Sequence, residues 1–285
     1  IRTRAFAEAC GLPELKGRKP FGGHVLSHDF VEAALIRRSG WAVYMLPGLT
    51  GSYEETPPCL IDLATRDRRW AQGNMQHMKI VGAKGLNWVS RVHLVQGIMS
   101  YLASPLWLML LLAGLLLATV ARHTAPNYFP DSFSLFPVWP VFDPELALRL
   151  FAITFVVLYL PKLLALILAL KDSELRKGCG GTVGLFKSVL AETFVSMLLS
   201  PIMMLIQSRV VADVMIGRDS GWNAQNRDDQ AMPFKACARV HAAHVVAGLA
   251  FGVLAFHISW ATFLWLAPIA GALMLSPLVS RSTGL

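Results

Sequence analysis

The chain has 285 residues, of which 54% are hydrophobic and only 15% are charged, well below the roughly 25% charged residues of soluble domains. This composition excludes an ordinary soluble domain and indicates a membrane protein. The net charge of +8 favours contact with anionic lipid headgroups or with a phosphorylated substrate. No nucleic-acid-binding motif accompanies the charge, so we expect no nucleic-acid partner. Thirteen of the 26 Lys and Arg residues lie in the first 91 positions, so the basic segment precedes the apolar part.

The four cysteines, Cys10, Cys59, Cys179 and Cys237, form no close pair and no CxxC motif. This spacing predicts reduced thiols, with neither a disulfide framework nor a zinc site. The first residues, IRTRAFAEAC, include no initiator methionine and show no signal peptide. We therefore expect the chain to be the C-terminal part of a longer protein.

Residues 1–91 predict the last part of an α/β domain. FGGHVLSHD (21–29) is typical of a glycine-rich loop and a short strand, and DFVEAALIRRSG (29–40) is typical of a capped helix. WAVYMLP (41–47) predicts a second strand, closed by a proline and a glycine. A loop follows over 48–58, and the segment 58–81 predicts one helix or two.

The remaining residues, 92–285, predict a bundle of transmembrane helices. Residues 94–121 carry no charge over 28 positions, about 42 Å as a helix, which exceeds the ~30 Å hydrocarbon core. The segment 189–216 is long but contains several polar residues, so it predicts either a helix along the membrane surface or a tight hairpin near Pro201. The expected spans are 94–121, 150–170, 240–256 and 260–279, the last two joined as an antiparallel hairpin.

The positive charges of the loops predict the sidedness of these spans. The segment 122–148 carries few positive residues, whereas 171–188 and 217–239 each carry four. The positive-inside rule then puts the first outside and the other two in the cytoplasm. It follows that 189–216 crosses an even number of times, and that both ends of the chain are cytoplasmic.

Two motifs resemble those of processive family 2 glycosyltransferases, the group that includes cellulose and hyaluronan synthases. LSHD (26–29) stands where the family has TED, and RDRRW (66–70) stands where it has QxxRW. Asp29, Arg69 and Trp70 match the family motifs, whereas Ser27-His28 and Arg66 depart from them. Further stretches resemble the members that build the backbone of bacterial osmoregulated periplasmic glucans, namely LTGSYEETPP (49–58), MSYLASPLW (99–107), LFPVWP (135–140), WNAQNRDD (222–229) and FLWLAPI (263–269).

The resemblance implies an α-helical polytopic membrane bundle preceded by the C-terminal part of a GT-A-like glycosyltransferase domain. It implies a processive, inverting glucosyltransferase of the bacterial inner membrane, which extends a β-glucan from UDP-glucose and passes it across the bilayer. A divalent cation, Mg²⁺ or Mn²⁺, is expected in the full-length enzyme, with ligands outside this chain. The resemblance also suggests an acyl carrier protein and a periplasmic glucan-biosynthesis protein as partners.

Asp29 is the expected general base, because an acceptor hydroxyl needs a proton acceptor within hydrogen-bond reach when it attacks the sugar. Its alternative role is a helix N-cap. Arg69, and less strongly Arg68 and Arg66, are expected to stabilise the charge that develops on the leaving pyrophosphate. Their alternative is a basic collar at the membrane. Trp70 is expected to stack on the acceptor sugar, or else to anchor the chain at the interface.

Three further residues are weaker candidates. Glu54 and Glu55 either line the acceptor cleft or form a solvated acidic pair before the helix. His28 either tunes Asp29 or plays a structural role, and we expect no metal site within this chain. Two other functions remain open, a synthase of another β-linked polysaccharide and a transporter that moves a preformed glycan without catalysis.

Overall fold

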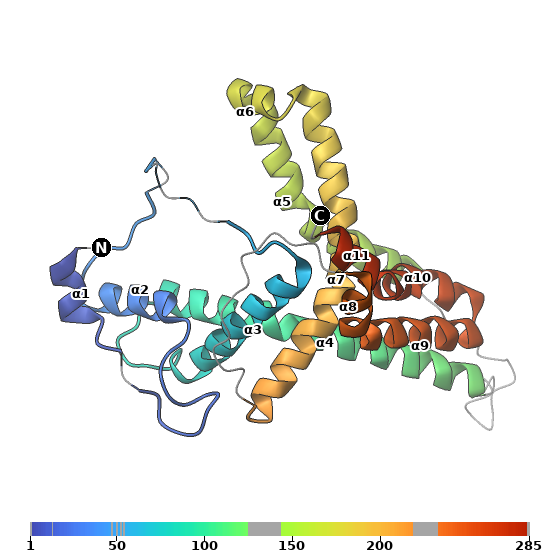
Figure 1. Ribbon diagram of the computed structural model, residues 1–285, viewed down its shortest axis with the longest axis horizontal. Helices are drawn as coiled ribbons and strands as arrows, with labels where there is room; N and C mark the ends of the chain where they lie inside the picture. Colours follow the sequence, from blue (N-terminus) through green and yellow to red (C-terminus); the bar gives the residue numbers. More distant parts are fainter. Residues whose placement is uncertain are drawn as a thin grey trace, which may run out of the picture. The chain divides into compact units, whose positions relative to one another are not determined.

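The computed structural model describes residues 2–283 except 13, 47, 50, 52, 54, 125–143 and 219–232. The chain divides into two compact units, Ile1–Leu115 with Leu198–Leu285, and Leu116–Met197 (Figure 1). Within the described residues the regular elements are helices. They are α1 (Thr3–Ala9), α2 (His28–Arg38), α3 (Leu60–Gln76), the 3₁₀ turn η1 (His77–Lys79), α4 (Trp88–His123), α5 (Pro144–Lys171), α6 (Ser173–Gly178), α7 (Gly181–Met215), α8 (Phe234–Val240), α9 (Ala242–Ile258), α10 (Trp260–Met274) and α11 (Ser276–Ser282).

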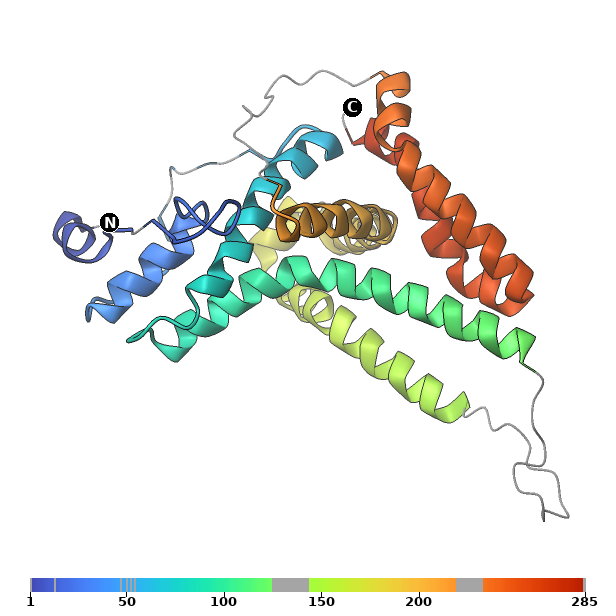
Figure 2. The same cartoon turned by 90° about the horizontal axis from the view of Figure 1, so that it is seen from below.

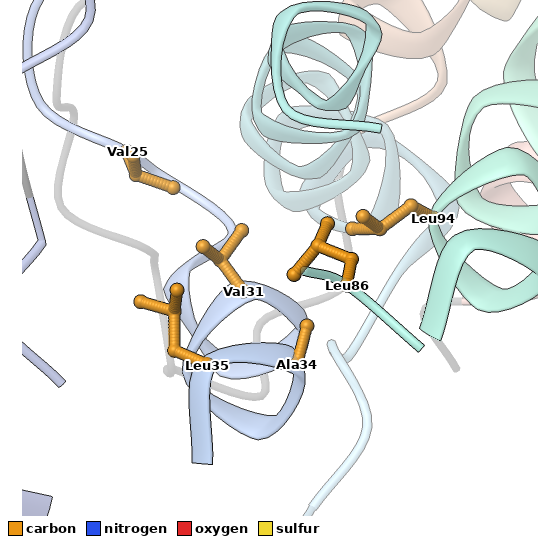
Figure 3. Close-up of a cluster of buried hydrophobic side chains, with 6 residues drawn as sticks. All are labelled: Val25, Val31, Ala34, Leu35, Leu86 and Leu94. Atoms are coloured by element: carbon orange, nitrogen blue, oxygen red, sulfur yellow. The ribbon is translucent and has the colours of Figure 1, made fainter. Parts of the chain in front are cut away.

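The helix predicted over 29–40 is confirmed as α2. Its inward face is apolar, and Gly40 follows it with a φ of +85° that ends the helix at low steric cost. The buried face packs into a cluster that joins α2 to the loop before it, to the segment before α4 and to α4 itself (Figure 3). The members of this cluster are Val25, Val31, Ala34, Leu35, Leu86 and Leu94.

Both predicted strands are wrong. In place of a strand, the segment before α2 is a loop, which forms a single isolated bridge between Leu15 and Gly23. The Gln76 side chain satisfies three backbone groups of this loop: its Oε1 accepts from the Leu26 N–H at 3.0 Å, and its Nε2 donates to the Pro20 and His24 carbonyls at 3.1 Å. Residues 41–46 likewise have no regular structure. A strand needs a neighbour to share its backbone hydrogen bonds, and the described residues place none beside either segment.

Helix α3 is a single helix that packs against α4 and the last turns of α7. Ala71 and Met75 of α3 are almost fully buried there, at 1% and 0% exposed. Their cluster continues through Tyr101 of α4 and the apolar end of α7, which contributes Val210, Val211 and Val214. This packing attaches the basic segment 65–74 to two of the apolar helices.

The predicted antiparallel hairpin near the end of the chain is confirmed. Helices α9 and α10 run side by side in both views (Figures 1 and 2), and Ser259 alone connects them. The Ser259 hydroxyl caps α10 by accepting a hydrogen bond from the Thr262 N–H at 3.0 Å. Gly248 lies at the crossing, where a methyl group would come within 2.7 Å of the Ala270 carbonyl oxygen.

Among the described residues, three helices are long and apolar enough to cross a membrane: Trp88–His123, Leu148–Lys171 and Gly181–Met215. Two bent pairs, α8 with α9 and α10 with α11, raise this number to five if each pair counts as one span. The predicted spans lie within these helices, while the crossings themselves stay predictions. Helix α7 continues through Pro201, so it forms no hairpin there.

The second unit contains the end of α4, all of α5 and α6, and the first half of α7. Lys162 of α5 forms an ion pair with Glu192 of α7, with an Nζ–Oε2 distance of 2.5 Å. Two opposite charges on apolar helices are far less costly when they are paired. Glu192 also accepts a hydrogen bond from Ser196 at 2.7 Å.

The close approach of α9 and α10 predicts a difference between two glycines of α9. Gly248→Ala forces the helices apart and should destabilise the protein by about 1–3 kcal/mol, as overpacking does. Gly252→Ala meets only an ordinary contact at 3.9 Å, so its better helix propensity makes it neutral or stabilising by up to about 1 kcal/mol. Thermal unfolding of both variants in detergent measures the difference. Equal unfolding temperatures would contradict this packing.

The sidedness can be tested with Cys179, which is exposed between α6 and α7. We expect an impermeant maleimide to label it in inside-out membrane vesicles and not in right-side-out vesicles, because the segment 171–188 is predicted to be cytoplasmic. Cys237 is 0% exposed and would report little. Cys179→Ser supplies the control, since it must abolish the signal. Labelling confined to right-side-out vesicles would overturn the predicted topology.

Candidate functional site

Asp29 and Trp70 lie on the same cleft, although 41 residues separate them in the sequence. The cleft has a volume of about 400 Å³ and is formed by the start of α2, the middle of α3 and the first half of α4. The residues that line it are Ser27, Asp29, Phe30, Trp70, Asn74, Gly97, Ser100 and Tyr101. The structure thus combines the two motif residues expected to act on the acceptor.

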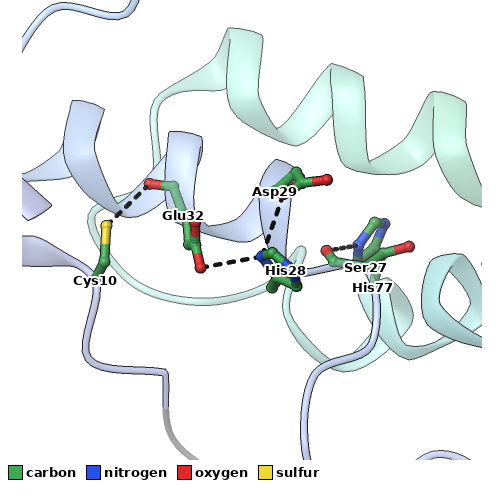
Figure 4. A network of polar contacts seen from close by, with 6 residues as sticks. All are labelled: Cys10, Ser27, His28, Asp29, Glu32 and His77. Atoms are coloured by element: carbon green, nitrogen blue, oxygen red, sulfur yellow. Dashed lines mark hydrogen bonds and ion pairs between the residues drawn. The ribbon is translucent and has the colours of Figure 1, made fainter. Parts of the chain in front are cut away.

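The position of α2 against α3 is set by close contacts around Ser27. Gly73 of α3 lies so near that a methyl group there would come within 2.6 Å of the Ser27 nitrogen. His77, which is 0% exposed, contacts the Ser27 carbonyl oxygen through Nε2 at 3.4 Å (Figure 4). The His77 ring also packs edge-on against Phe30. Burial lowers the pKa of His77, so the ring is neutral near pH 7. These contacts fix the first turn of α2 and with it Asp29.

Asp29 does not cap α2. The N-cap position is Ser27, no side chain makes a capping hydrogen bond, and Asp29 lies inside the first helical turn with 87% of its side chain exposed. Its Oδ1 is 3.2 Å from His28 Nδ1, which is also 3.1 Å from Glu32 Oε1 (Figure 4). Glu32 is 16% exposed, so this carboxylate holds the His28 ring beside Asp29. The sequence analysis missed Glu32, although its position one helical turn after His28 could have indicated it.

His28, Asp29 and Glu32 also offer three potential metal ligands within 4.8 Å of one another. Carboxylate oxygens such as those of Asp29 and Glu32 are ligands that a divalent cation such as Mg²⁺ prefers. In this structure His28 Nδ1 lies 3.2 Å from Asp29 Oδ1 and 3.1 Å from Glu32 Oε1. The ligands of the expected cation stay a prediction for the whole protein.

The three arginines of RDRRW point to different surroundings. The Arg66 guanidinium lies over the Trp70 ring, 4.5 Å from its centroid, which is cation–π geometry. Arg68 Nη2 is 3.0 Å from Asp213 Oδ2 of α7. Arg69 is partly buried and immediately precedes Trp70. Residues two apart on a helix face different sides, so the structure separates Arg66 from Arg68.

Asp67, between these arginines, organises a partly buried polar chain that no sequence motif had indicated. Its two carboxylate oxygens accept from Tyr101 Oη at 2.8 Å and from Gln207 Nε2 at 2.9 Å. Gln207 Oε1 in turn accepts from Ser104 Oγ at 2.5 Å. The chain joins α3, α4 and α7, and it holds Tyr101 on the wall of the cleft. The polar residues in the otherwise apolar segment 189–216 were its signal in the sequence.

Asn74 and Trp70 give the cleft the means to bind a sugar. Trp70 is 48% exposed, and a flat aromatic face of this kind packs against a sugar ring. Asn74 Nδ2 donates to the Trp70 carbonyl at 2.8 Å, while its Oδ1 is buried without a partner among the described residues. A sugar hydroxyl can satisfy that oxygen.

Of the two glutamates predicted beside the cleft, the structure describes Glu55. Glu55 is exposed on the chain before α3 and does not line the cleft. Glu54 lies outside the described residues, as do the stretches 135–140 and 222–229. The grouping of Glu54 and Glu55 with Asp29 therefore stays a prediction.

The fold and the cleft define a helical protein with apolar, membrane-length helices and an acidic and aromatic cleft on its polar segment. The chain is 52% identical over 284 residues to the protein named glucans biosynthesis glucosyltransferase H of Shewanella oneidensis, a match that covers 100% of this chain and 39% of that protein. It is 53% identical over 268 residues to the protein of the same name from Vibrio cholerae serotype O1, covering 94% of this chain and 37% of the relative.

The chain therefore spans about 39% of the length of the curated relatives it matches, and it is homologous to a C-terminal portion of them. This confirms the resemblance to one group within the family 2 glycosyltransferases that was predicted from the motifs. No protein-family model and no solved structure matches the chain.

The polar chain predicts that Asp67 is important for stability. Asp67→Ala leaves the Tyr101 hydroxyl and the Gln207 amide without their acceptor, and each buried, unsatisfied donor costs about 1–3 kcal/mol. Thermal unfolding should show a clear loss. Glu8→Ala, at a surface carboxylate paired only within α1, should change stability by less than about 0.5 kcal/mol. If Asp67→Ala unfolds like Glu8→Ala, the polar chain does not hold these helices together.

Proposed function

We propose that this chain is the acceptor-side and membrane part of a processive, inverting glucosyltransferase. The enzyme takes glucose from UDP-glucose, extends the β-glucan backbone of osmoregulated periplasmic glucans and passes it across the bacterial inner membrane. The observation that supports this most strongly is the presence of Asp29 and Trp70 on one cleft. The names of the relatives support glucan biosynthesis and glucosyl transfer.

The proposed reaction forms one bond and breaks one. An acceptor hydroxyl oxygen attacks the anomeric carbon of the donor glucose, the bond from that carbon to UDP breaks, and the hydroxyl proton passes to Asp29. Asp29 suits this role because its carboxylate is exposed in the cleft and is not used as a helix cap. His28 and Glu32 act as positioning residues, since their contacts restrain Asp29 from one side.

Trp70 holds the acceptor chain between additions. The Arg66 guanidinium covers one face of its ring, so the sugar stacks on the rest of the exposed indole. Arg66 thereby replaces the glutamine of the family motif with a residue that orients the tryptophan. Tyr101, Ser100 and Asn74 supply polar atoms on the cleft wall for the sugar hydroxyls.

Arg69 is the first candidate to stabilise the leaving pyrophosphate, because it matches the arginine of the family motif. Arg68, whose Nη2 contacts Asp213, and Arg66 do not match that motif position and are weaker candidates. The divalent cation of the reaction, Mg²⁺ or Mn²⁺, is expected to bind to residues elsewhere in the whole protein and to supply further charge stabilisation on the phosphates. Partners of the whole protein, an acyl carrier protein and a periplasmic glucan-biosynthesis protein, are part of this proposal.

The proposed topology has both ends of the chain in the cytoplasm. The Leu60 N–H at the start of α3 contacts Thr283 Oγ1, just after α11, at 3.4 Å. Arg68 and Asp67 of α3 likewise contact the end of α7 through Asp213 and Gln207. The last turns of α7 and of the chain thus lie beside the basic helix that carries Trp70. This arrangement supports a cytoplasmic position for the end of α7 and for Thr283, while the proposal that the start of α7 lies on the same side depends on the positive charges of 171–188.

The central prediction concerns Asp29 in the full-length enzyme. Asp29→Asn keeps the shape of the side chain but cannot accept the proton, so UDP release from UDP-glucose should fall by about 10²-fold or more with unchanged UDP-glucose binding. Glu8→Gln is the matched control, because Glu8 is a surface carboxylate of α1 outside the cleft. Near-normal polymer synthesis by Asp29→Asn would remove Asp29 from the mechanism.

Trp70 should affect a different quantity. Trp70→Ala removes the stacking surface, which is worth about 0.5–1.5 kcal/mol for comparable aromatic contacts, so the glucan should become shorter while UDP release persists. Product length by gel filtration and UDP release by a coupled assay distinguish the two effects. A transporter without catalysis would release no UDP in any variant, and the wild-type assay therefore decides between the two functions.

A further inference from the structure

A second cavity, of about 700 Å³, lies on a different face of α3 from the cleft. Its walls come from the start of α3, the last third of α7, the end of α8 and the start of α9. Most of the wall is aliphatic, with contributions from Leu60, Ala64, Leu205, Ile206, Ala243 and Ala247. The cavity is thus open to an apolar ligand at the place where the basic helix meets the membrane-length helices.

The chemistry of this wall differs from that of the cleft. None of the described residues that line it is a phenylalanine, a tyrosine, a tryptophan or a carboxylate. Proteins bind sugar rings with flat aromatic faces and with several polar groups. This cavity has no phenylalanine, tyrosine or tryptophan and few polar side chains, so it is poorly suited to a sugar. Branched aliphatic walls instead suit a hydrocarbon chain, whose transfer from water or detergent is driven by burial of its methylene groups.

The polar side chains of the cavity include two histidines, His241 and His244, whose ring nitrogens are buried without a hydrogen-bond partner among the described residues. His241 is 1% exposed, and both of its ring nitrogens are buried without a hydrogen bond among the described residues. The ring packs edge-on against His244, with the centroids 4.9 Å apart. A neutral imidazole has one donor and one acceptor, and leaving them unpaired costs about 1–3 kcal/mol. A ligand with an oxygen acceptor and a hydroxyl donor would satisfy both nitrogens.

Two arginines give the same cavity a positive charge. Arg209 of α7 and Arg68 of α3 both line it. Arg68 contacts Asp213 through Nη2, but a guanidinium carries five N–H donors and retains others for a ligand. Arginine donors in this arrangement match phosphate oxygens.

We infer that the cavity between α3, α7 and α9 is a binding site for an anionic phospholipid. An acyl chain lies along the aliphatic wall, Arg209 and Arg68 hold the phosphate, and His241 binds the headgroup or ester oxygens. The lipid then fixes α3 from the side opposite to its contacts with Tyr101. This site is separate from the cleft and does not depend on the proposed reaction.

The test uses the purified, delipidated full-length protein and native mass spectrometry. The probes are phosphatidylglycerol and phosphatidylcholine with identical acyl chains, and inorganic phosphate and cellotetraose serve as competitors. Ala243→Phe fills the cavity, and Ala242→Phe is its control because Ala242 precedes it on α9 without lining the cavity. Arg209→Gln removes a phosphate donor, and Arg239→Gln on α8 is its control, an exposed arginine outside the cavity.

We expect the wild-type protein to retain phosphatidylglycerol about tenfold more than phosphatidylcholine, because both lipids carry the phosphate but only phosphatidylcholine adds a cationic choline, which Arg209 and Arg68 repel. Ala243→Phe and Arg209→Gln should each lower retention by a similar factor, while both controls keep it. Equal retention by all variants would overturn the proposal. So would displacement by inorganic phosphate, which would indicate a simple anion site, or by cellotetraose, which would indicate a glucan path. If Ala243→Phe fails to fold, Arg209→Gln against Arg239→Gln decides.

Discussion

The need to partner the charges of α3 is the constraint on which the rest of this structure depends. The helix lies against the apolar faces of α4 and α7, where an unpaired charge would cost several kcal/mol. Asp67 is satisfied by Tyr101 and Gln207, and Arg68 by Asp213. Each pairing uses a polar residue placed in an otherwise apolar helix. The contacts that offset the cost of burying these charges therefore also set the position of α3.

The position of α3 determines the cleft. Trp70 and Asn74 lie on the face of α3 that faces α2 and the first half of α4. At the end of α3, the side chains of Gln76 and His77 contact the backbone of the loop that leads into α2. Asp29 is placed through that loop rather than through a sheet. A displacement of α3 would move the aromatic and the acidic side of the cleft together, which keeps their spacing constant.

The opposite face of α3 serves a different environment. There the lining is aliphatic, with two arginines and a buried histidine, and the chemistry suits a lipid rather than a sugar. A single helix thus has one side facing the polar cleft and another facing the apolar helices. The residues of RDRRW contribute to both sides of the helix. Arg66 packs on the Trp70 ring beside the cleft, whereas Arg68 forms an ion pair with Asp213 of α7.

The sequence by itself determined the features that depend on local pattern. Uninterrupted apolar stretches predicted the membrane-length helices. The repeated apolar residues that end at Gly40 predicted α2, and the short connection at Ser259 predicted the α9–α10 hairpin. The motif residues Asp29 and Trp70 were also recognisable as a pair. Only the tertiary structure decided how the segment before α2 folds. A strand was expected there, but the backbone groups of Leu26 and Pro20 form hydrogen bonds with the side chain of Gln76, about 50 positions later in the chain. It also decided that the arginines of RDRRW diverge and that Asp67, Glu32 and His77 support the cleft. These outcomes rest on side chains that meet across long separations in the chain, and such contacts leave no period in the sequence.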